Sequence, residues 1–199
     1  MLKEIRLTLL VVSSFIFLGC ALTVDKIPLN YSAPEDIFIM ANKCKKGIIV
    51  QNIVDNRSIP NPTYILQKRN GYGMIASGAF EAEREVTVII TDALKDVLEK
   101  NKYNLKESGG EYLIKGKLSS IDEDYVMGFW AGNLKLKMEI ELSLVDTQKK
   151  ETVWKEFFVA HGISKKTVST KTAIQTAFED VVNDFLKQFV QSDFVSKIK

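Results

Sequence analysis

The chain has 199 residues, of which 46% are hydrophobic and 26% are charged, and its formal net charge is +2 at pH 7. This length suits one domain with a substantial core, and the plentiful Leu, Ile, Val and Phe residues argue against intrinsic disorder. A net charge so close to zero provides no general electrostatic basis for binding nucleic acid, so we expect no nucleic-acid partner.

The first 20 residues have the pattern of a secretion signal. Lys3 and Arg6 form a short basic region, and the apolar run at 7–19 is too short to span a bilayer comfortably. This run leads into "FLGC", which resembles the lipobox of bacterial lipoproteins. We therefore predict a signal peptide over residues 1–19 and acylation of Cys20, which becomes the new N-terminus. The alternative is an ordinary signal peptide or a membrane anchor that contains a cysteine.

The residue after Cys20 bears on the destination of the protein. By resemblance to lipoprotein sorting signals, Ala21 in place of Asp predicts the outer membrane, with the domain facing the periplasm. Several acyl chains would anchor the protein stably, because each buried methylene contributes about 0.8 kcal/mol. Removal of the signal takes away two positive charges and one negative charge, which lowers the formal charge from +2 to +1.

Acylation of Cys20 would leave Cys44 as the single thiol of the chain, so no intrachain disulfide is expected. Cys44 could be a core residue at a strand entrance, an intermolecular link or a reactive thiol. The lysines beside it would lower the pKa of the thiol, but lysines are ordinary near the start of a strand, so we favour the core residue.

Residues 20–46 are predicted to be the lipidated cysteine and an extended tether. Pro28 and Pro34 fix their own backbone φ and disfavour helix at the preceding residues. A single domain then covers residues 47–199. Its first strand is expected within 46–58, where a short apolar run ends in polar turn residues.

A long connection follows, in which residues 63–69 can form a short edge strand. From 81 to about 101, apolar residues recur every three or four positions and predict an amphipathic helix. The second main strand is expected at 111–126. The third, at 133–146, alternates strictly between apolar and polar residues, so one face of the sheet is predicted to be wet.

The fourth strand, at 151–162, is joined to the third by the turn at 146–150, which favours an antiparallel hairpin. A second amphipathic helix is predicted over 173–189, with a cap near residue 169 or 170. The expected order is β-α-β-β-β-α. The fold class is α+β: a two-layer sandwich with a mainly antiparallel four-stranded sheet and two long helices on one face.

Four short motifs give the chain a family resemblance. They are "DNRS" at 55–58, "KRNGYGM" at 68–74, "MGFWAGN" at 127–133 and "FVQSDFVSKI" at 189–198. Together they resemble the YajG-like family of bacterial envelope lipoproteins, across nearly the whole mature chain. The resemblance implies an acylated envelope protein with no established reaction.

The residue types that support catalysis are sparse in this sequence. His161 is the single histidine, and no nucleophile motif accompanies it, although Ser164 or Cys44 could pair with it in principle. The acidic run at 122–124 lacks the alternating oxygen ligands and the glycine of a calcium loop, so we interpret it as a solvated turn. We predict no catalytic residue, no metal site and no cofactor.

The aromatic pair in "GFWAG" at 128–132 supplies the candidate partner-binding residues. Phe129 and Trp130 stand between glycines at the expected bend between two strands, and Tyr72 stands in a second glycine loop. One interpretation is that these aromatics cap the core, and the other is that they contact an envelope protein, since exposed Trp and Tyr are typical binding anchors. A carrier or sensor that binds a lipid or cell-wall fragment between the helices and the sheet is the alternative function.

Overall fold

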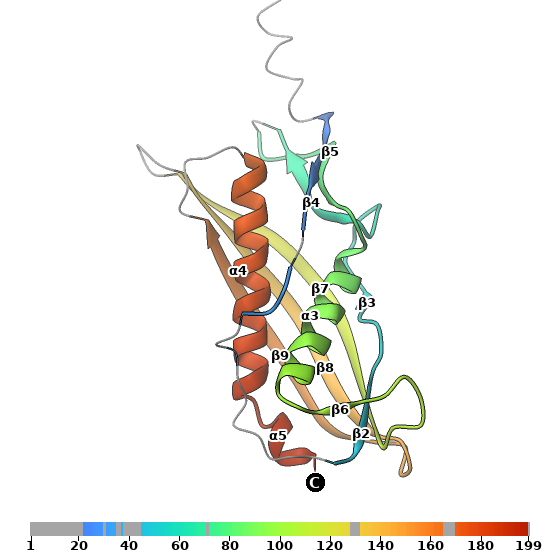
Figure 1. The fold of residues 1–199 in the computed structure, drawn as a ribbon. Helices are drawn as coiled ribbons and strands as arrows, with labels where there is room; N and C mark the ends of the chain where they lie inside the picture. The colour runs from blue at the N-terminus through green and yellow to red at the C-terminus, as the bar shows by residue number, and fades with distance from the viewer. Residues whose placement is uncertain are drawn as a thin grey trace, which may run out of the picture.

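The computed structural model describes residues 22–29, 31–34, 37, 45–70, 72–127, 132–164 and 170–198. Within these ranges the fold is α+β (Figure 1). The elements are β1 (Val24–Ile27), β2 (Gly47–Val50), β3 (Val54–Asp55), β4 (Tyr64–Arg69), β5 (Ile75–Ala82), α3 (Val86–Lys100), β6 (Asn104–Leu105), β7 (Tyr112–Met127), β8 (Gly132–Asp146), β9 (Glu151–Ser164), α4 (Thr170–Gln191) and α5 (Phe194–Lys197).

The strands form two sheets, and the prediction of one four-stranded sheet was wrong. The larger sheet has the order β6-β2-β7-β8-β9, with β3 also pairing with β7, and the smaller has the order β1-β5-β4. Both sheets are mixed, because β2, β3, β6 and β1 make parallel pairs whereas β7, β8 and β9 are antiparallel. Parallel partners come from distant parts of the chain, and local periodicity does not reveal them.

The smaller sheet includes two segments that we did not predict as strands. β5 lies in the expected connection, and its small residues carry little strand propensity. β1 lies in the predicted tether and pairs in parallel with β5, and the same segment buries Ile27, Leu29 and Ile37 in the core. The described residues of the segment 20–46 are therefore packed on the domain. The prolines exclude a helix there but not an extended strand.

The long strands confirm the predicted antiparallel hairpin and the predicted buried face of residues 133–146. β7 pairs with β8 from Tyr112↔Asp146 to Met127↔Gly132, and β8 pairs with β9 over nearly its whole length. All six apolar residues at even positions 134–144 are buried, whereas the polar residues between them from Lys135 to Ser143 are half-buried.

Both predicted helices are present and lie over the same face of the long strands (Figure 1). Side chains of both helices and of the sheet are buried together in one core. Its aromatic part is a cluster in which Trp154 and Phe158 of β9 contact Phe185 and Phe189 of α4, and Phe194 of α5 packs against Trp154. Among the described helices, none is long and apolar enough to cross a membrane.

Candidate functional site

The first element of the candidate site is an ion pair between Asp55, at the end of β3, and Arg57. The guanidinium is almost fully buried and donates from Nε and Nη2 to the two carboxylate oxygens of Asp55, at 2.9 and 2.7 Å. It also donates to the backbone carbonyls of Tyr64 and Ile65 in β4, at 2.8 and 3.3 Å. Arg57 therefore joins the larger sheet to the smaller one.

Two opposing influences set the pKa of Asp55. Burial raises the pKa of this carboxyl, but the hydrogen bonds and the positive charge of Arg57 outweigh the burial and leave the pKa below its ordinary value. The pair is thus charged at neutral pH, and its role is structural.

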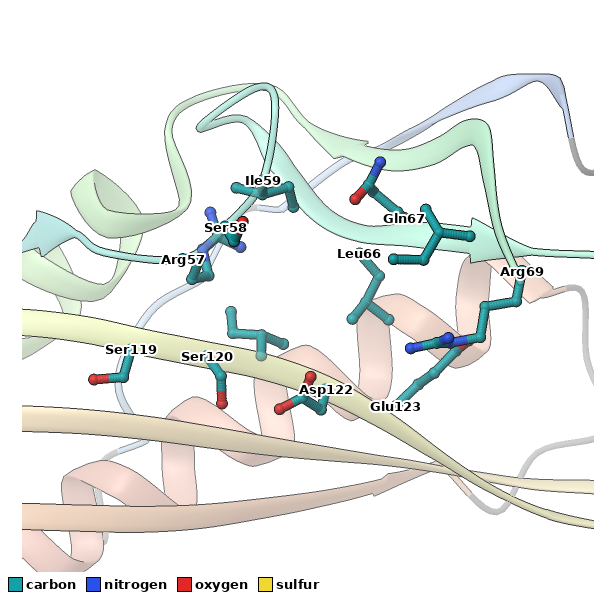
Figure 2. A pocket seen from close by; sticks show the side chains of 12 residues that line it. Arg57, Ser58, Ile59, Leu66, Gln67, Arg69, Ser119, Ser120, Asp122 and Glu123 are labelled. Carbon is teal, nitrogen blue, oxygen red and sulfur yellow. The ribbon is translucent and has the colours of Figure 1, made fainter. Parts of the chain in front are cut away.

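A groove, which we call the edge groove, opens beside this ion pair between β4 and β7 (Figure 2). It has a volume of about 280 Å³. Its walls are residues 57–59 after β3, Leu66, Gln67 and Arg69 of β4, Ile75 of β5, and Ser119–Glu123 of β7. Figure 2 shows Leu66 pointing from β4 toward β7.

The edge groove borders the edge of β7 rather than one of its faces. Successive strand residues point to opposite faces, so a pocket on one face would be lined by alternate residues. Here the five consecutive residues Ser119–Glu123 all line it. The backbone edge of β7 is therefore one wall of the groove.

This edge of β7 is open over the length of the groove. The N–H of Asn56 donates to the carbonyl of Leu118 at 2.9 Å, and there β3 leaves β7. Beyond Leu118, in the ranges that the structure describes, β7 pairs with β8 alone, and β4 pairs with β5 alone. The open edge of β7 thus faces the Leu66 side of β4 across the groove.

The outer edge of β9 provides a contrast. Asp184 of α4 accepts a hydrogen bond from the N–H of His161 at 2.8 Å, and Gln188 donates to the carbonyl of Val159 at 3.0 Å. Proteins commonly cover exposed strand edges in this way, because an open edge pairs with other chains.

The register of the three long strands shows which groups of β7 face the groove. The N–H of His161 bonds to Asp184 and therefore points away from β8. His161 and its opposite residue Lys137 thus form a pair without mutual hydrogen bonds, in which Lys137 directs its N–H and C=O away from β9 and toward β7. Its partner on β7 is Asp122, whose N–H and C=O therefore point toward β8. Alternation then directs the N–H and C=O of Ile121 and Glu123 away from β8 and into the groove. These backbone groups are suited to hydrogen-bonding an added strand.

Glu123 and Arg69 form the charged end of the edge groove. The carboxylate and the guanidinium approach to 3.6 Å, and Arg69 also donates to the carbonyl of Gly73 at 2.9 Å. Burial raises the pKa of Glu123, and the charge of Arg69 opposes this rise only in part. The hydroxyl of Ser120 in β7 is buried without a hydrogen-bond partner among the described residues. The groove is equipped for recognition by backbone and polar groups.

The predicted partner-binding residues are only partly covered by the structure. Tyr72 is 90% exposed in the turn between β4 and β5. This turn is held by the side chain of Asn70, which accepts hydrogen bonds from the N–H groups of Tyr72 and Met74, and Gly73 takes a positive φ of 77° that favours glycine. Phe129 and Trp130 lie outside the described residues, as do Cys20 and Cys44.

The structure does not bring the candidate catalytic residues together. His161 is exposed, whereas Ser164 is buried with its hydroxyl unpaired within the described chain. The acidic residues 122–124, which we had interpreted as a solvated turn, lie in β7 instead. No cluster of three potential metal ligands is found in the part of the chain that the structure describes.

The sequence analysis did not predict the edge groove, although a change in the alternation of apolar residues along β7 indicates where it begins. Buried residues of β7 fall at even positions up to Leu118, and the next buried residue is Ile121, at an odd position. This change of parity reflects the bulge between Leu118 and Ser120, which redirects the strand where the groove begins.

Comparisons with known proteins address the fold. No family model and no curated protein matches the sequence. Among solved structures, the chain is similar to protein XCC0632 from Xanthomonas campestris, described as DUF330, with a TM-score of 0.61 and 15% identity over 84% of this chain and 92% of that one.

Two weaker similarities are to proteins described as lipoproteins. A minor lipoprotein from Acinetobacter baumannii has a TM-score of 0.45 and 12% identity, over 76% of this chain and 93% of that one. Lipoprotein GNA1162 from Neisseria meningitidis has a TM-score of 0.40 and 11% identity, over 74% of this chain and 99% of that one. None of these three proteins is described as YajG-like, so membership of that family stays a prediction. At these identities the chain shares its fold, and no demonstrated activity, with the DUF330 protein.

Proposed function

We propose that the chain is a noncatalytic lipoprotein, anchored to the periplasmic face of the outer membrane through acyl chains on Cys20. It acts as an accessory or assembly factor that binds an extended segment of an envelope protein partner in the edge groove. The observation that carries the partner proposal is the open edge of β7 that lines this groove.

Edge pairing fits the residues that line the groove. An added strand gains affinity from main-chain hydrogen bonds, here to Ile121 and Glu123, and specificity from side-chain contacts. Leu66 and Ile75 supply apolar contacts, and Glu123 can accept a basic side chain. By contrast, the space between the helices and the sheet is occupied by buried core residues, which favours this proposal over a carrier with a cleft there.

The anchor is tested by replacing Cys20 with serine. A hydroxyl cannot form the thioether that carries the lipid, so we expect Cys20→Ser to abolish incorporation of a fatty-acid analogue during metabolic labelling. Wild-type protein expressed at the same level is the control. Labelling that persists undiminished in the variant would contradict the proposed anchor.

The partner contact is tested by photocrosslinking in intact cells. A photoreactive amino acid in place of Gln67, on the β4 wall of the edge groove, should form an adduct with one envelope protein. Mass spectrometry should place the crosslinks within one short segment of that protein, because an added strand is extended and contiguous. The matched control carries the same amino acid at Gln148, an exposed turn residue between β8 and β9.

The open edge itself is measured by amide exchange in the purified protein. The N–H groups of Ile121 and Glu123 should exchange much faster than that of Asp122, which is bonded to β8. Slow exchange at both outward-facing amides would show that the edge is closed. Adducts of equal yield from Gln67 and Gln148 would show that the crosslinked contact is unspecific.

A further inference from the structure

A second surface, which shares Ile75 with the edge groove, consists of exposed apolar side chains toward one end of the molecule. We call it the apolar end, and it consists of Leu22, Val24, Tyr72, Met74 and Ile75. Tyr72 is 90% exposed, and Leu22, Met74 and Ile75 are each about 60% exposed. Neighbouring exposed apolar residues of this size mark an interaction surface in a soluble domain.

The pairing of the smaller sheet brings these residues together. β1 runs parallel to β5 with Val24 opposite Ala79, four residues along β5 from Ile75, and the residues before Val24 continue in the direction of the start of β5. β5 begins at Ile75, directly after the turn that carries Tyr72 and Met74. In Figure 1 the chain enters β1 at the end of the molecule where β4 and β5 are joined, opposite the end that carries the C-terminus.

We infer that the apolar end is seated in the interfacial layer of the membrane to which Cys20 anchors the chain. The inference rests on the proposed acylation. Leu22 is the second residue after Cys20, and two extended residues span at most about 7 Å. An acylated Cys20 therefore holds Leu22 at the depth of the lipid headgroups. Tyrosine is enriched at this depth because its ring is apolar and its hydroxyl is wet.

The charges beside the apolar end are compatible with a lipid surface. An unpaired carboxylate would be repelled by anionic headgroups, but Asp25 of β1 is paired with both Lys68 and Lys171, at 2.8 and 3.2 Å. The hydrogen bond from Lys68 and the charges of Lys68 and Lys171 lower the pKa of Asp25, and burial, which raises it, opposes this effect only in part. Arg69, half exposed beside the turn, is likewise paired, with Glu123 at 3.6 Å.

A membrane contact at the apolar end would determine the orientation of the domain. Acyl chains hold a protein at the membrane but leave its orientation free. A seated apolar end would fix the long axis of the domain relative to the membrane, with the C-terminal end pointing away from it. The edge groove, which opens beside Arg69 and Ile75, would then lie close to the membrane surface.

The test uses the full acylated protein in vesicles of phosphatidylethanolamine and phosphatidylglycerol whose acyl chains carry bromine, which quenches tryptophan. Trp130→Phe removes one native tryptophan, and Trp154 stays buried in the core. Tyr72→Trp then reports on the apolar end, and Gln148→Trp reports on the opposite end as the matched control. Because an interfacial residue is buried about 5–10 Å into the headgroup and acyl boundary, we expect roughly twofold quenching at position 72 and none at position 148.

Sedimentation with the same vesicles separates this inference from the anchor. If the protein sediments and Tyr72→Trp is not quenched, the anchor stands and the membrane contact is overturned. Tyr72→Trp could instead be protected from an aqueous quencher and yet not be quenched by bromine. The apolar end would then be a protein contact, and the proposed membrane contact would be overturned. Failure of the acylated protein to sediment would overturn both the anchor and the inference. An unchanged melting temperature of Tyr72→Trp shows that the exposed substitution leaves the fold intact.

Discussion

Replacing Gly162 with alanine is expected to destabilise the domain by about 3 kcal/mol or more, at the upper end of overpacking effects. Gly162 lies in β9 where α4 crosses it. A Cβ atom there would overlap the carbonyl oxygen of Ala177 and would fall 2.6 Å from the backbone nitrogen of Val181. Because both contacts are to backbone, no side chain can rotate away, and the helix must move off the sheet. Chemical denaturation of the two proteins measures the difference.

The matched control is His161→Ala, one residue away on β9. The His161 side chain is exposed and its backbone N–H, which bonds to Asp184, is kept in the variant. We expect a change in unfolding free energy within about 0.5 kcal/mol. If Gly162→Ala were as stable as this control, the close approach of α4 to β9 would be refuted.

Replacing Arg57 with alanine is expected to cost about 3–5 kcal/mol, because it leaves the carboxylate of Asp55 buried without its partner. The variant also leaves the carbonyls of Tyr64 and Ile65 without their donor. The loss should appear as a lower denaturant midpoint. Arg84→Ala is the control: its ion pair with Asp92 is about half exposed on both sides, and its loss should cost less than about 1 kcal/mol. Equal losses in the two variants would show that the buried Arg57–Asp55 ion pair does not hold the two sheets together.

The cost of removing Arg57 should depend on pH with a definite sign. In the wild type the pKa of Asp55 lies below its ordinary value of 3.8, so the pair stabilises the fold above that pH and this stabilisation is lost as pH falls through the folded pKa. In Arg57→Ala the guanidinium is lost, and the backbone N–H of residue 57, which donates to Oδ1 of Asp55 at 3.1 Å, is left as the opposing influence of that residue. We therefore expect burial to raise the pKa of Asp55 relative to the wild type, so that the variant is destabilised at neutral pH and this destabilisation is relieved on acidification. The stability gap between the two proteins should therefore narrow from pH 7 to pH 4. A gap that widens would contradict the assignment.

The functional residues differ in how far sequence could identify them. Tyr72 was predicted to stand in a glycine loop, and it does, because Asn70 and Gly73 determine that turn locally. Whether its side chain caps the core or is exposed was left open, and the structure shows it exposed. The edge groove could not be predicted from any one segment. It arises where β3 leaves β7 and β4 approaches from the other sheet, and these segments meet only in the folded chain.

The sequence by itself determined both helices, the three long strands and the buried face of β8. The helices and the buried face depend on a periodicity of neighbouring residues, which is near 3.6 in α3 and α4 and 2 in β8. It also determined the Tyr72 turn through residues only three or four apart. Only the tertiary structure decided that there are two sheets, that residues 24–27 form a strand on β5 rather than a tether, and that β7 keeps an open edge. Those features depend on hydrogen bonds between backbones far apart in the chain. Every residue except proline carries the same backbone donor and acceptor, so these groups do not specify the partner strand. The partner is decided by which strand edges the packed core brings together.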